Sequence, residues 1–363
     1  MEEKELVIIG GGPAGLCAAI EARKKGIGVL LIDENLKPGG QLFKQIHRFF
    51  GSRQHMAGIR GITIGETLLK EVEKVETDVW LDSVAYGIFR NRIIGVVKNG
   101  KNILVRAKTI LVAAGALENP LPFPGWTLPG VMGAGACQTM VNIHRVLPGK
   151  KALIIGAGNV GLIVAYQLIQ AGAEIKAVID IMPEITGYMV HAAKIKRSGV
   201  PIFLSTTVLE AIGKKEVKAA VICPVDNNFK PIYKKRKLLD VDLICIAVGL
   251  SPLNELLYQA DCEFTYKPYL GGRLALHNEN METTVDGIFV AGDCSGIEEA
   301  STAMEEGKLA GISAAEKIRK KQWDDEKLDI RNRLNDFRIG TFGEKRKISK
   351  EEIIREYHER IKT

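Results

Sequence analysis

Residues 6–33 read LVIIGGGPAGLCAAIEARKKGIGVLLID, and this stretch decides the fold. Its first four residues are apolar and have the length and composition of a buried parallel strand. The G-x-G-x-x-G run from Gly10 to Gly15 then turns the chain straight into a helix, and a second apolar strand, 29–32, ends at Asp33. Strand, glycines, helix, strand and acid in this order predict a dinucleotide-binding site.

Each glycine of the run has a separate physical job. Gly10 permits the tight turn, Gly12 lets a pyrophosphate approach the backbone, and Gly15 lets the helix pack closely on the strand. The N–H groups and the dipole of the helix N-terminus then stabilise the phosphate charge. Asp33 is placed to accept hydrogen bonds from a ribose, and a tight turn with an empty site does not explain this acid.

The same device returns after residue 150. Residues 152–155 predict a strand, Gly156 to Gly161 form a second G-x-G-x-x-G run, and the strand 177–179 ends at Asp180. An internal repeat of the βαβ unit predicts a second nucleotide-binding domain. A degenerate copy kept for packing is the alternative.

Three further strands are expected to end in glycine turns. They read TILVAAG at 109–115, DLICIAVG at 242–249 and GIFVAGD at 287–293. Asp293 stands at the end of the third strand, before a long helix expected over 298–319, and can reach a sugar hydroxyl there. Residues 131–147 are also expected to be helical.

Composition bounds the class of protein. With 363 residues, 46% hydrophobic and 26% charged, the chain fits an ordinary globular protein of two domains. The net charge of +7 is mild, and the basic run 234–237 fits a solvated hairpin better than a nucleic-acid surface. No apolar stretch reaches the roughly 18 residues of a membrane span. The first strand begins at once, so no signal peptide is expected, and we expect a cytoplasmic protein.

The six cysteines lie far apart and show neither C-x-x-C nor metal-ligand spacing. They are expected to be small buried or loop residues, and no metal site is expected.

With these motifs in this order, the chain resembles the two-dinucleotide-domain flavoproteins that include glutathione reductase and thioredoxin reductase. The resemblance covers residues 1 to about 320. It implies an α/β fold of two Rossmann-like domains, the second inserted in the first, with a helical C-terminal extension. It implies an FAD-binding domain in two parts, 1–118 and 250–319. An inserted NAD(H)-binding domain is implied at 119–249, and a charged helical extension at 320–363.

The resemblance also implies, by position, two sets of cofactor-binding residues. FAD would contact Gly10, Gly12, Pro13, Ala14, Gly15, Asp33, Glu34, Gly40, Gln41, Ala114, Gly115, Gly292 and Asp293. NAD(H) would contact Gly156, Gly158, Asn159, Val160, Gly161, Asp180 and Gly249. No catalytic side chain is expected, because hydride would pass between nicotinamide and flavin. His47 and His55 are the candidates for a polar role at the flavin edge.

Three segments, 38–41, 123–131 and 133–139, are similar to a narrower branch of this family. That branch holds the FAD-containing alpha subunits of heteromeric amino-acid oxidoreductases, such as octopine and nopaline oxidase, hydrogen cyanide synthase, dye-linked proline dehydrogenase and sarcosine oxidase. It implies a partner flavoprotein that oxidises the amino acid. Longer members end in a cysteine-rich iron–sulfur module that this sequence lacks, which leaves open a small iron–sulfur protein as a further partner. Some members hold NAD or ATP in the second site.

One departure from the wider family bears on the chemistry. Disulfide reductases carry C-x-x-C in the middle domain or C-x-x-x-x-C just after the first domain's acid. Here the loop after Gln41 has no cysteine and Cys137 stands alone. Passing electrons to a disulfide by exchange needs two vicinal thiols, so a disulfide reductase is not expected.

We therefore expect an FAD-dependent, NAD(H)-linked electron-transfer subunit of an amino-acid dehydrogenase or oxidase, acting on proline, hydroxyproline, sarcosine or an opine. The alternatives are a stand-alone NADH:acceptor oxidoreductase and a subunit whose nucleotides only hold the fold.

The C-terminal region is highly charged. Its Ser349–Glu352 segment predicts a capping box at the start of a helix. Beyond it, Ile353, Ile354, Tyr357 and Ile361 fall on one helical stripe. A helix packed on its own domain and a contact to a partner both fit this pattern.

Overall fold

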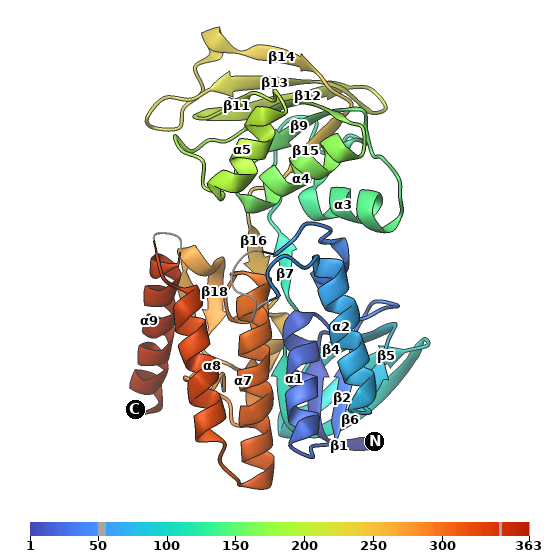
Figure 1. Ribbon diagram of the computed structural model, residues 1–363, viewed down its shortest axis with the longest axis vertical. Helices are drawn as coiled ribbons and strands as arrows, with labels where there is room; N and C mark the ends of the chain where they lie inside the picture. Colours follow the sequence, from blue (N-terminus) through green and yellow to red (C-terminus); the bar gives the residue numbers. More distant parts are fainter. Residues whose placement is uncertain (50–55, 341–342, 363) are drawn as a thin grey trace. The chain divides into compact units, whose positions relative to one another are not determined.

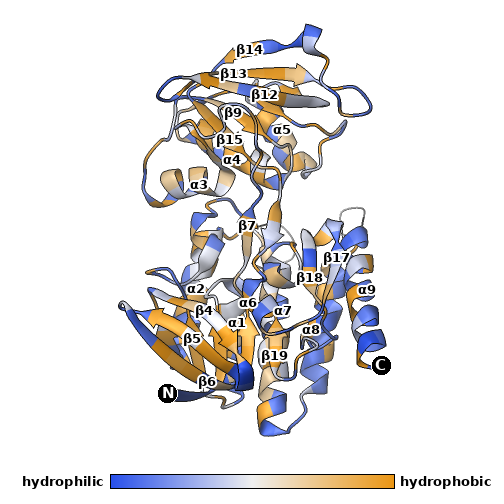
Figure 2. Cartoon of the chain, turned by 180° about the vertical axis from the view of Figure 1, so that it is seen from behind, coloured by the Kyte–Doolittle hydropathy of each residue, from blue (hydrophilic) through white to orange (hydrophobic). Residues whose placement is uncertain are grey.

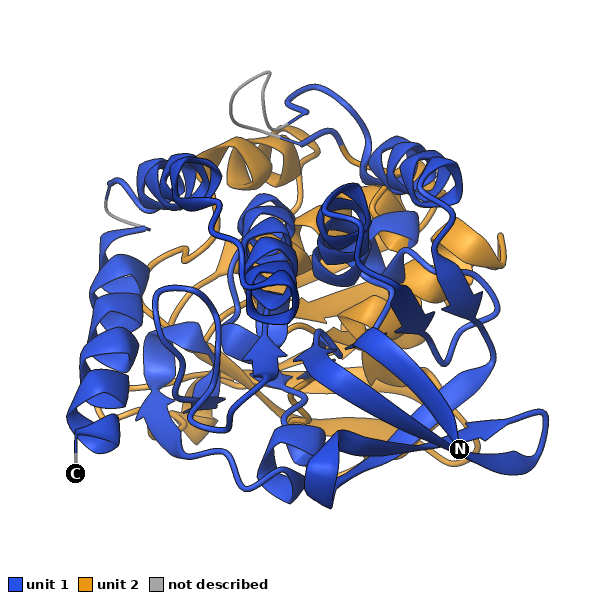
Figure 3. Ribbon diagram, turned by 90° about the horizontal axis from the view of Figure 1, so that it is seen from below, with its two compact units in different colours: residues 1–43, 48–117, 250–363 blue, residues 44–47, 118–249 orange. Residues whose placement is uncertain are grey.

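The computed structural model describes residues 1–49, 56–340 and 343–362. The chain forms two compact units, which Figure 3 colours separately. Unit 1 comprises residues 1–43, 48–117 and 250–363, and unit 2 comprises residues 44–47 and 118–249. Each unit is built around a mainly parallel sheet.

The sheet of unit 1 has the strand order β3-β2-β1-β6-β5-β4, with β19 also paired to β6. Strands β1, β2, β3, β6 and β19 are parallel, and the β4–β5–β6 edge is an antiparallel meander. Figure 2 shows that β5 is more hydrophobic than the helices α8 and α9 of the extension. The strands are β1 (Glu2–Ile9), β2 (Val29–Ile32), β3 (Asp78–Trp80), β4 (Ser83–Phe89), β5 (Ile93–Lys98), β6 (Lys101–Val112) and β19 (Ile288–Val290).

The helices α1 and α7 of unit 1 pack side by side (Figure 1). Glycine makes this close approach possible: a Cβ on Gly307 would lie 2.1 Å from the carbonyl oxygen of Ala14, and one on Gly311 would lie 2.4 Å from that of Ala18. The helices of this unit are α1 (Pro13–Lys24), α2 (Gly61–Lys74), α6 (Glu255–Gln259), α7 (Ala300–Arg319), α8 (Asp324–Phe337) and α9 (Glu344–Ile361). The short strands β17 (Phe264–Lys267) and β18 (Gly272–Ala275) form a hairpin.

Unit 2 has a parallel sheet in the order β11-β10-β9-β15-β8, together with a separate antiparallel sheet of β12, β13 and β14. Its strands are β8 (Val131–Gly133), β9 (Lys151–Ile155), β10 (Glu174–Ile179), β11 (Ile202–Phe203), β12 (Thr206–Gly213), β13 (Val217–Pro224), β14 (Lys237–Asp240) and β15 (Leu243–Ile246). Its helices are α3 (Ala134–Gln138), α4 (Asn159–Gln170) and α5 (Met189–Arg197). The strands that lead into and out of it, β7 (Ala116–Glu118) and β16 (Leu250–Pro252), pair with each other.

Two predictions of local structure are wrong. The predicted helix over 131–147 begins with strand β8, because the apolar pair Val131–Met132 adds an edge strand to β15; only residues 134–143 are helical. The predicted capping box at Ser349 lies inside α9, which begins at Glu344. The Ser349 hydroxyl instead donates to the carbonyl of Lys345, the bond that a serine within a helix can make to the preceding turn. None of the helices in the described ranges is long and apolar enough to cross a membrane.

Candidate dinucleotide sites

The register of the unit 1 sheet brings the predicted segments to one edge. Ile9 pairs with Ile32 and with Val112, and Val112 pairs with Val290. The chain therefore leaves β1, β2, β6 and β19 at the same carboxyl edge, where ligands of open α/β sheets bind. The residues that follow these strands are Gly10–Gly15, Asp33–Glu34, Ala113–Gly115 and Ala291–Asp293.

The first glycine turn leaves open space at a helix N-terminus. A Cβ on Gly10 would lie 2.2 Å from the carbonyl oxygen of Ala113, and one on Gly15 would lie 1.9 Å from that of Gly10, so both positions need glycine for packing. A Cβ on Gly12 would meet nothing within 4 Å. Helix α1 begins with Pro13, has no side-chain cap and carries no acidic residue in its first turn. An uncapped N-terminus beside an open glycine fits a phosphate group.

Asp33 is buried and ties the loops of the site together. Its Oδ2 accepts a hydrogen bond from the Gly11 N–H at 2.6 Å, and its Oδ1 accepts from the Asn35 N–H and Nδ2 at 2.8 Å each. The sequence predicted a ribose acceptor here, and the structure adds this bracing of the glycine turn. The next carboxylate, that of Glu34, is exposed.

The loop after the acid folds back onto the glycine turn. The Gly39 N–H donates to the Gly11 carbonyl at 2.6 Å, and a Cβ on Gly40 would lie 2.9 Å from the Gly12 Cα. Gln41 is the second residue of the 3₁₀ helix Gly40–Lys44 and is exposed. Gly40 therefore needs to be glycine because a side chain there would collide with the backbone of Gly12.

The segments that follow β6 and β19, residues 113–115 and 291–293, lie close together in unit 1. The Gly115 carbonyl accepts from the Leu253 N–H at 3.0 Å and from the Cys294 thiol at 3.4 Å. A Cβ on Gly292 would lie 2.9 Å from the Cβ of Ala14, which places the Gly-Asp turn against the first turn of α1. Burial, helped by the neighbouring carboxylates of Glu306 and Glu299, raises the pKa of Asp293 to about 6. Ala114, before Gly115, is partly buried.

Unit 2 repeats the first turn almost contact for contact. A Cβ on Gly156 would lie 2.2 Å from the Ala247 carbonyl oxygen, and one on Gly161 would lie 2.0 Å from that of Gly156. At Gly158 the nearest atom would be the Thr186 hydroxyl at 3.7 Å. Helix α4 has no side-chain cap and no acidic residue in its first turn. This N-terminus also fits a phosphate group.

Asp180 repeats the bracing by Asp33. Its Oδ2 accepts from the Ala157 N–H at 2.6 Å, and its Oδ1 accepts from the Met182 N–H at 2.9 Å. Ile155 pairs with both Ile179 and Ile246, so the turn at 156, Asp180 and the residues after β15 share one edge. Gly249 follows β15 by three residues and adopts a φ of 110°. Its carbonyl oxygen accepts a hydrogen bond from the Asn119 N–H.

The sequence analysis missed the loop that closes the second turn. The Gly187 N–H donates to the Ala157 carbonyl at 3.1 Å, and a Cβ on Gly187 would lie 2.8 Å from the carbonyl carbon of Gly158. Asn159 Oδ1 accepts from the Tyr188 N–H at 2.7 Å, while Val160 is exposed. A signal for this loop was present in the sequence: Gly187 follows Asp180 at a short distance, as Gly39 and Gly40 follow Asp33.

His47, the candidate histidine within the described residues, lies outside the two glycine turns. His47 belongs to unit 2, its ring centroid is 6.3 Å from that of His191, and burial first and then His191 lower its pKa to about 4. His55 lies outside the described residues. All six cysteines are buried and free of disulfides. Within the ranges described, no group of three or more His, Cys, Asp or Glu side chains is arranged to hold a metal ion.

The apolar stripe of the extension packs mainly on unit 1. Ile353 and Tyr357 are buried against Leu270, Leu274 and Leu276. Ile354 is partly buried and Ile361 is exposed. The structure therefore favours a helix packed on its own unit over a docking stripe.

Comparisons with known proteins identify the family of the chain. The sequence matches the family described as "Pyridine nucleotide-disulphide oxidoreductase" over residues 4–307. An opine oxidase subunit from Agrobacterium tumefaciens (strain Ach5) is 31% identical over 333 residues, covering 85% of this chain and 65% of the relative. The hydrogen cyanide synthase subunit HcnB from Pseudomonas aeruginosa is 28% identical over 340 residues, covering 85% of this chain and 70% of the relative.

The fold is shared with solved structures. L-proline dehydrogenase from P. horikoshii aligns with a TM-score of 0.70 and 22% identity, covering 92% of this chain and 59% of that chain. The expected fold class and the expected resemblance are confirmed.

Proposed function

Because the chain belongs to the pyridine nucleotide-disulphide oxidoreductase family, we propose that it is an electron-transfer subunit of a heteromeric amino-acid dehydrogenase or oxidase. It is an FAD-dependent oxidoreductase, as are the members of that family. We assign FAD to the carboxyl edge of unit 1 and NAD(H) to that of unit 2. ATP or another nucleotide is the alternative occupant of the second site.

One observation carries the assignment. Each unit brings an open glycine, an uncapped helix N-terminus without acidic residues in its first turn, and a braced carboxylate to one sheet edge. The helix N-terminus favours a pyrophosphate, and the carboxylate retains lone pairs for ribose hydroxyls. When bound, the flavin and the nicotinamide supply the redox chemistry by exchanging a hydride, and the protein supplies position and electrostatics.

The cysteines support transfer to a partner protein over disulfide reduction. Disulfide exchange needs an accessible thiolate with a second thiol nearby. Burial raises the pKa of Cys17 and of Cys294 to about 12, which keeps both as inert thiols. No pair in the sequence has the spacing of a redox disulfide.

The subunit role is supported by the relatives. The opine oxidase relative and HcnB are both named as subunits, and the chain spans 65% of the first and 70% of the second. We propose that a second flavoprotein oxidises the amino acid and that a small iron–sulfur protein is a further candidate partner. The substrate class would be proline, hydroxyproline, sarcosine or an opine.

Anaerobic titration of the FAD-containing protein tests the proposal. NADH should bleach the visible absorbance of the flavin, and artificial dyes should then be reduced. Proline, sarcosine, glycine and hydroxyproline should leave the isolated chain oxidised. Amino-acid turnover by the isolated chain would overturn the subunit role, and a flavin that NADH does not bleach would favour nucleotides that only hold the fold.

A further inference from the structure

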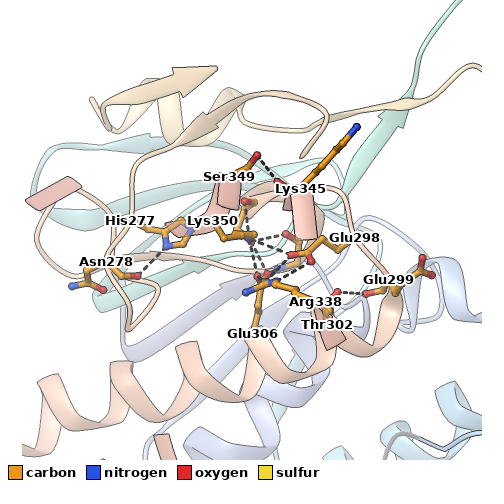
Figure 4. A network of polar contacts seen from close by, with 12 residues as sticks. His277, Asn278, Glu298, Glu299, Thr302, Glu306, Arg338, Lys345, Ser349 and Lys350 are labelled. Atoms are coloured by element: carbon orange, nitrogen blue, oxygen red, sulfur yellow. Dashed lines mark hydrogen bonds and ion pairs between the residues drawn. The ribbon is translucent and has the colours of Figure 1, made fainter. Parts of the chain in front are cut away.

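A buried carboxylate links the Gly-Asp turn of unit 1 to the C-terminal extension (Figure 4). Glu306, on α7, is 2% exposed. Its Oε2 accepts hydrogen bonds from the Ser295 hydroxyl at 2.6 Å and from the Gly292 N–H at 3.1 Å. Its Oε1 accepts from Lys350 Nζ at 2.7 Å and from Arg338 Nη2 at 2.9 Å. One oxygen therefore holds the turn, and the other is held by the extension.

The two cations make further contacts at the same place. Lys350, which is 3% exposed, also donates to the carbonyl oxygen and to the hydroxyl oxygen of Ser295, at 2.9 Å each. Arg338 forms a two-point ion pair with Glu298, through Nε at 2.9 Å and Nη2 at 2.6 Å. Lys350 therefore touches the turn directly, whereas Arg338 acts through carboxylates.

The charges of this cluster balance only when the extension is present. Glu298 and Glu306 lie within the stretch that matches the family, which ends at residue 307, and both cations lie beyond it. Removing one partner of a buried ion pair leaves an uncompensated charge, which is strongly unfavourable. The uncompensated charge would sit beside Asp293, whose pKa the Glu306 carboxylate already raises and the Lys350 ammonium lowers.

We infer that Lys350 and Arg338 are positioning residues for the flavin: through Glu306 they hold the turn 292–295 in the conformation that presents Asp293 to the cofactor. The inference rests on the proposed function, since it needs FAD in unit 1. It makes the extension part of the flavin site, although α9 lies more than 30 residues after the family match ends.

The first test compares two lysines of the same helix. Lys350→Met removes the buried ammonium at similar length, Lys350→Arg keeps the charge, and Lys347→Met is the matched control because Lys347 is partly exposed. The readouts are the FAD dissociation constant, the midpoint potential of the bound flavin, and binding of NADH in unit 2. A purely structural role for Lys350 predicts no shift of the potential in a folded variant.

Lys350→Met should weaken FAD binding by about tenfold or more and shift the flavin potential, because the turn loses its cation. Lys350→Arg should restore most of the affinity, and Lys347→Met should match the wild type. Equal affinity and potential in wild type and a folded Lys350→Met variant would overturn the inference. A wild-type chain that binds no FAD would instead overturn the proposed function.

A second variant covers the case in which Lys350→Met does not fold. The double variant Glu306→Gln with Lys350→Met removes one anion and one cation together and leaves Arg338 paired with Glu298, so the cluster keeps no uncompensated charge. It should fold and still bind FAD more weakly than wild type, because the Lys350 contacts to Ser295 are gone. Wild-type FAD affinity in this double variant would contradict the positioning role.

Discussion

The two glycine turns share their local contacts and differ in what surrounds them. In both, the first glycine would place a Cβ 2.2 Å from a carbonyl oxygen of a neighbouring strand end. In both, the acid after the second strand accepts a backbone N–H from the middle of the G-x-G at 2.6 Å. The βαβ sequence therefore produces the same open glycine turn twice.

Beyond the opening the units diverge. Unit 1 adds the turn 292–295, which packs against α1, and fixes it with α7 and the extension. In unit 2 the loop at Gly187 and Tyr188 closes directly onto the start of α4. The two units therefore share the glycine turn and its bracing acid, and differ in the segments that fix the surroundings of that turn.

The largest expected effect separates the two openings. Gly12→Val should give a folded but colourless protein, with FAD affinity reduced by at least about 100-fold, or about 2.7 kcal/mol. The backbone of Gly12 is extended, with φ −73° and ψ −173°, which valine can adopt, and the new Cβ would meet no protein atom within 4 Å. Gly158→Val, with φ −75° and ψ 178°, should keep the flavin and lose NADH binding. Flavin content and NADH calorimetry measure both, and a yellow Gly12→Val protein would disprove the assignment.

The next effect concerns the α1–α7 contact of unit 1. Gly307→Ala should lower the free energy of unfolding by about 2.5 kcal/mol, because the new Cβ would lie 2.1 Å from the carbonyl oxygen of Ala14 and a rotamer change cannot relieve that contact. Gly28→Ala is the control, since its Cβ would meet only the Glu5 carboxylate, at 3.5 Å. Urea unfolding distinguishes them, and equal stability of the two variants would contradict the packing argument.

A smaller effect concerns the stability of the protein in acid, which depends on the buried His277 near Lys350. Burial, and then Lys350, lower the pKa of His277 from 6.5 to about 4. The unfolded chain then binds a proton at His277 that the folded chain does not, so this stability is present above pH 6.5 and is lost as the pH falls through about 4. At pH 5 the loss should be about 2 kcal/mol.

His277→Gln should flatten the difference in stability between pH 7 and pH 5 relative to wild type. The comparison with wild type is needed because Asp293, whose pKa is raised to about 6, contributes stability below pH 3.8 that is lost as the pH rises through 6. Parallel pH profiles for the two proteins would show that His277 does not titrate in this way.

The smallest effect tests the second opening alone. NADH should reduce the flavin more efficiently than NADPH, because the Asp180 carboxylate repels a 2′-phosphate and residues 181–184 offer no arginine to neutralise it. Asp180→Asn should lower the ratio of kcat/KM for NADH to kcat/KM for NADPH by about tenfold, or about 1.4 kcal/mol. Faster reduction of the wild type by NADPH would show the assignment of Asp180 to be wrong.

Local patterns predicted most of the two openings. Gly10, Gly15, Gly156 and Gly161 need glycine because backbone atoms occupy the place of a side chain, and a short motif carries that requirement. The capping box at Ser349 was wrong because the same side chain can satisfy a carbonyl inside a helix as well as an N–H at its start. The bracing roles of Asp33 and Asp180 were missed because a carboxylate at a strand end reaches ribose and backbone donors equally well.

The amino-acid sequence by itself determined where the two βαβ units lie, which glycines open them and which acids end their second strands, because backbone sterics and strand register act over a few residues. Only the tertiary structure decided that Glu306, Arg338 and Lys350 meet beneath the turn 292–295. Nothing local predicts that meeting. A buried carboxylate needs a counter-charge, and any of the 50 lysines and arginines could supply it until the chain is folded.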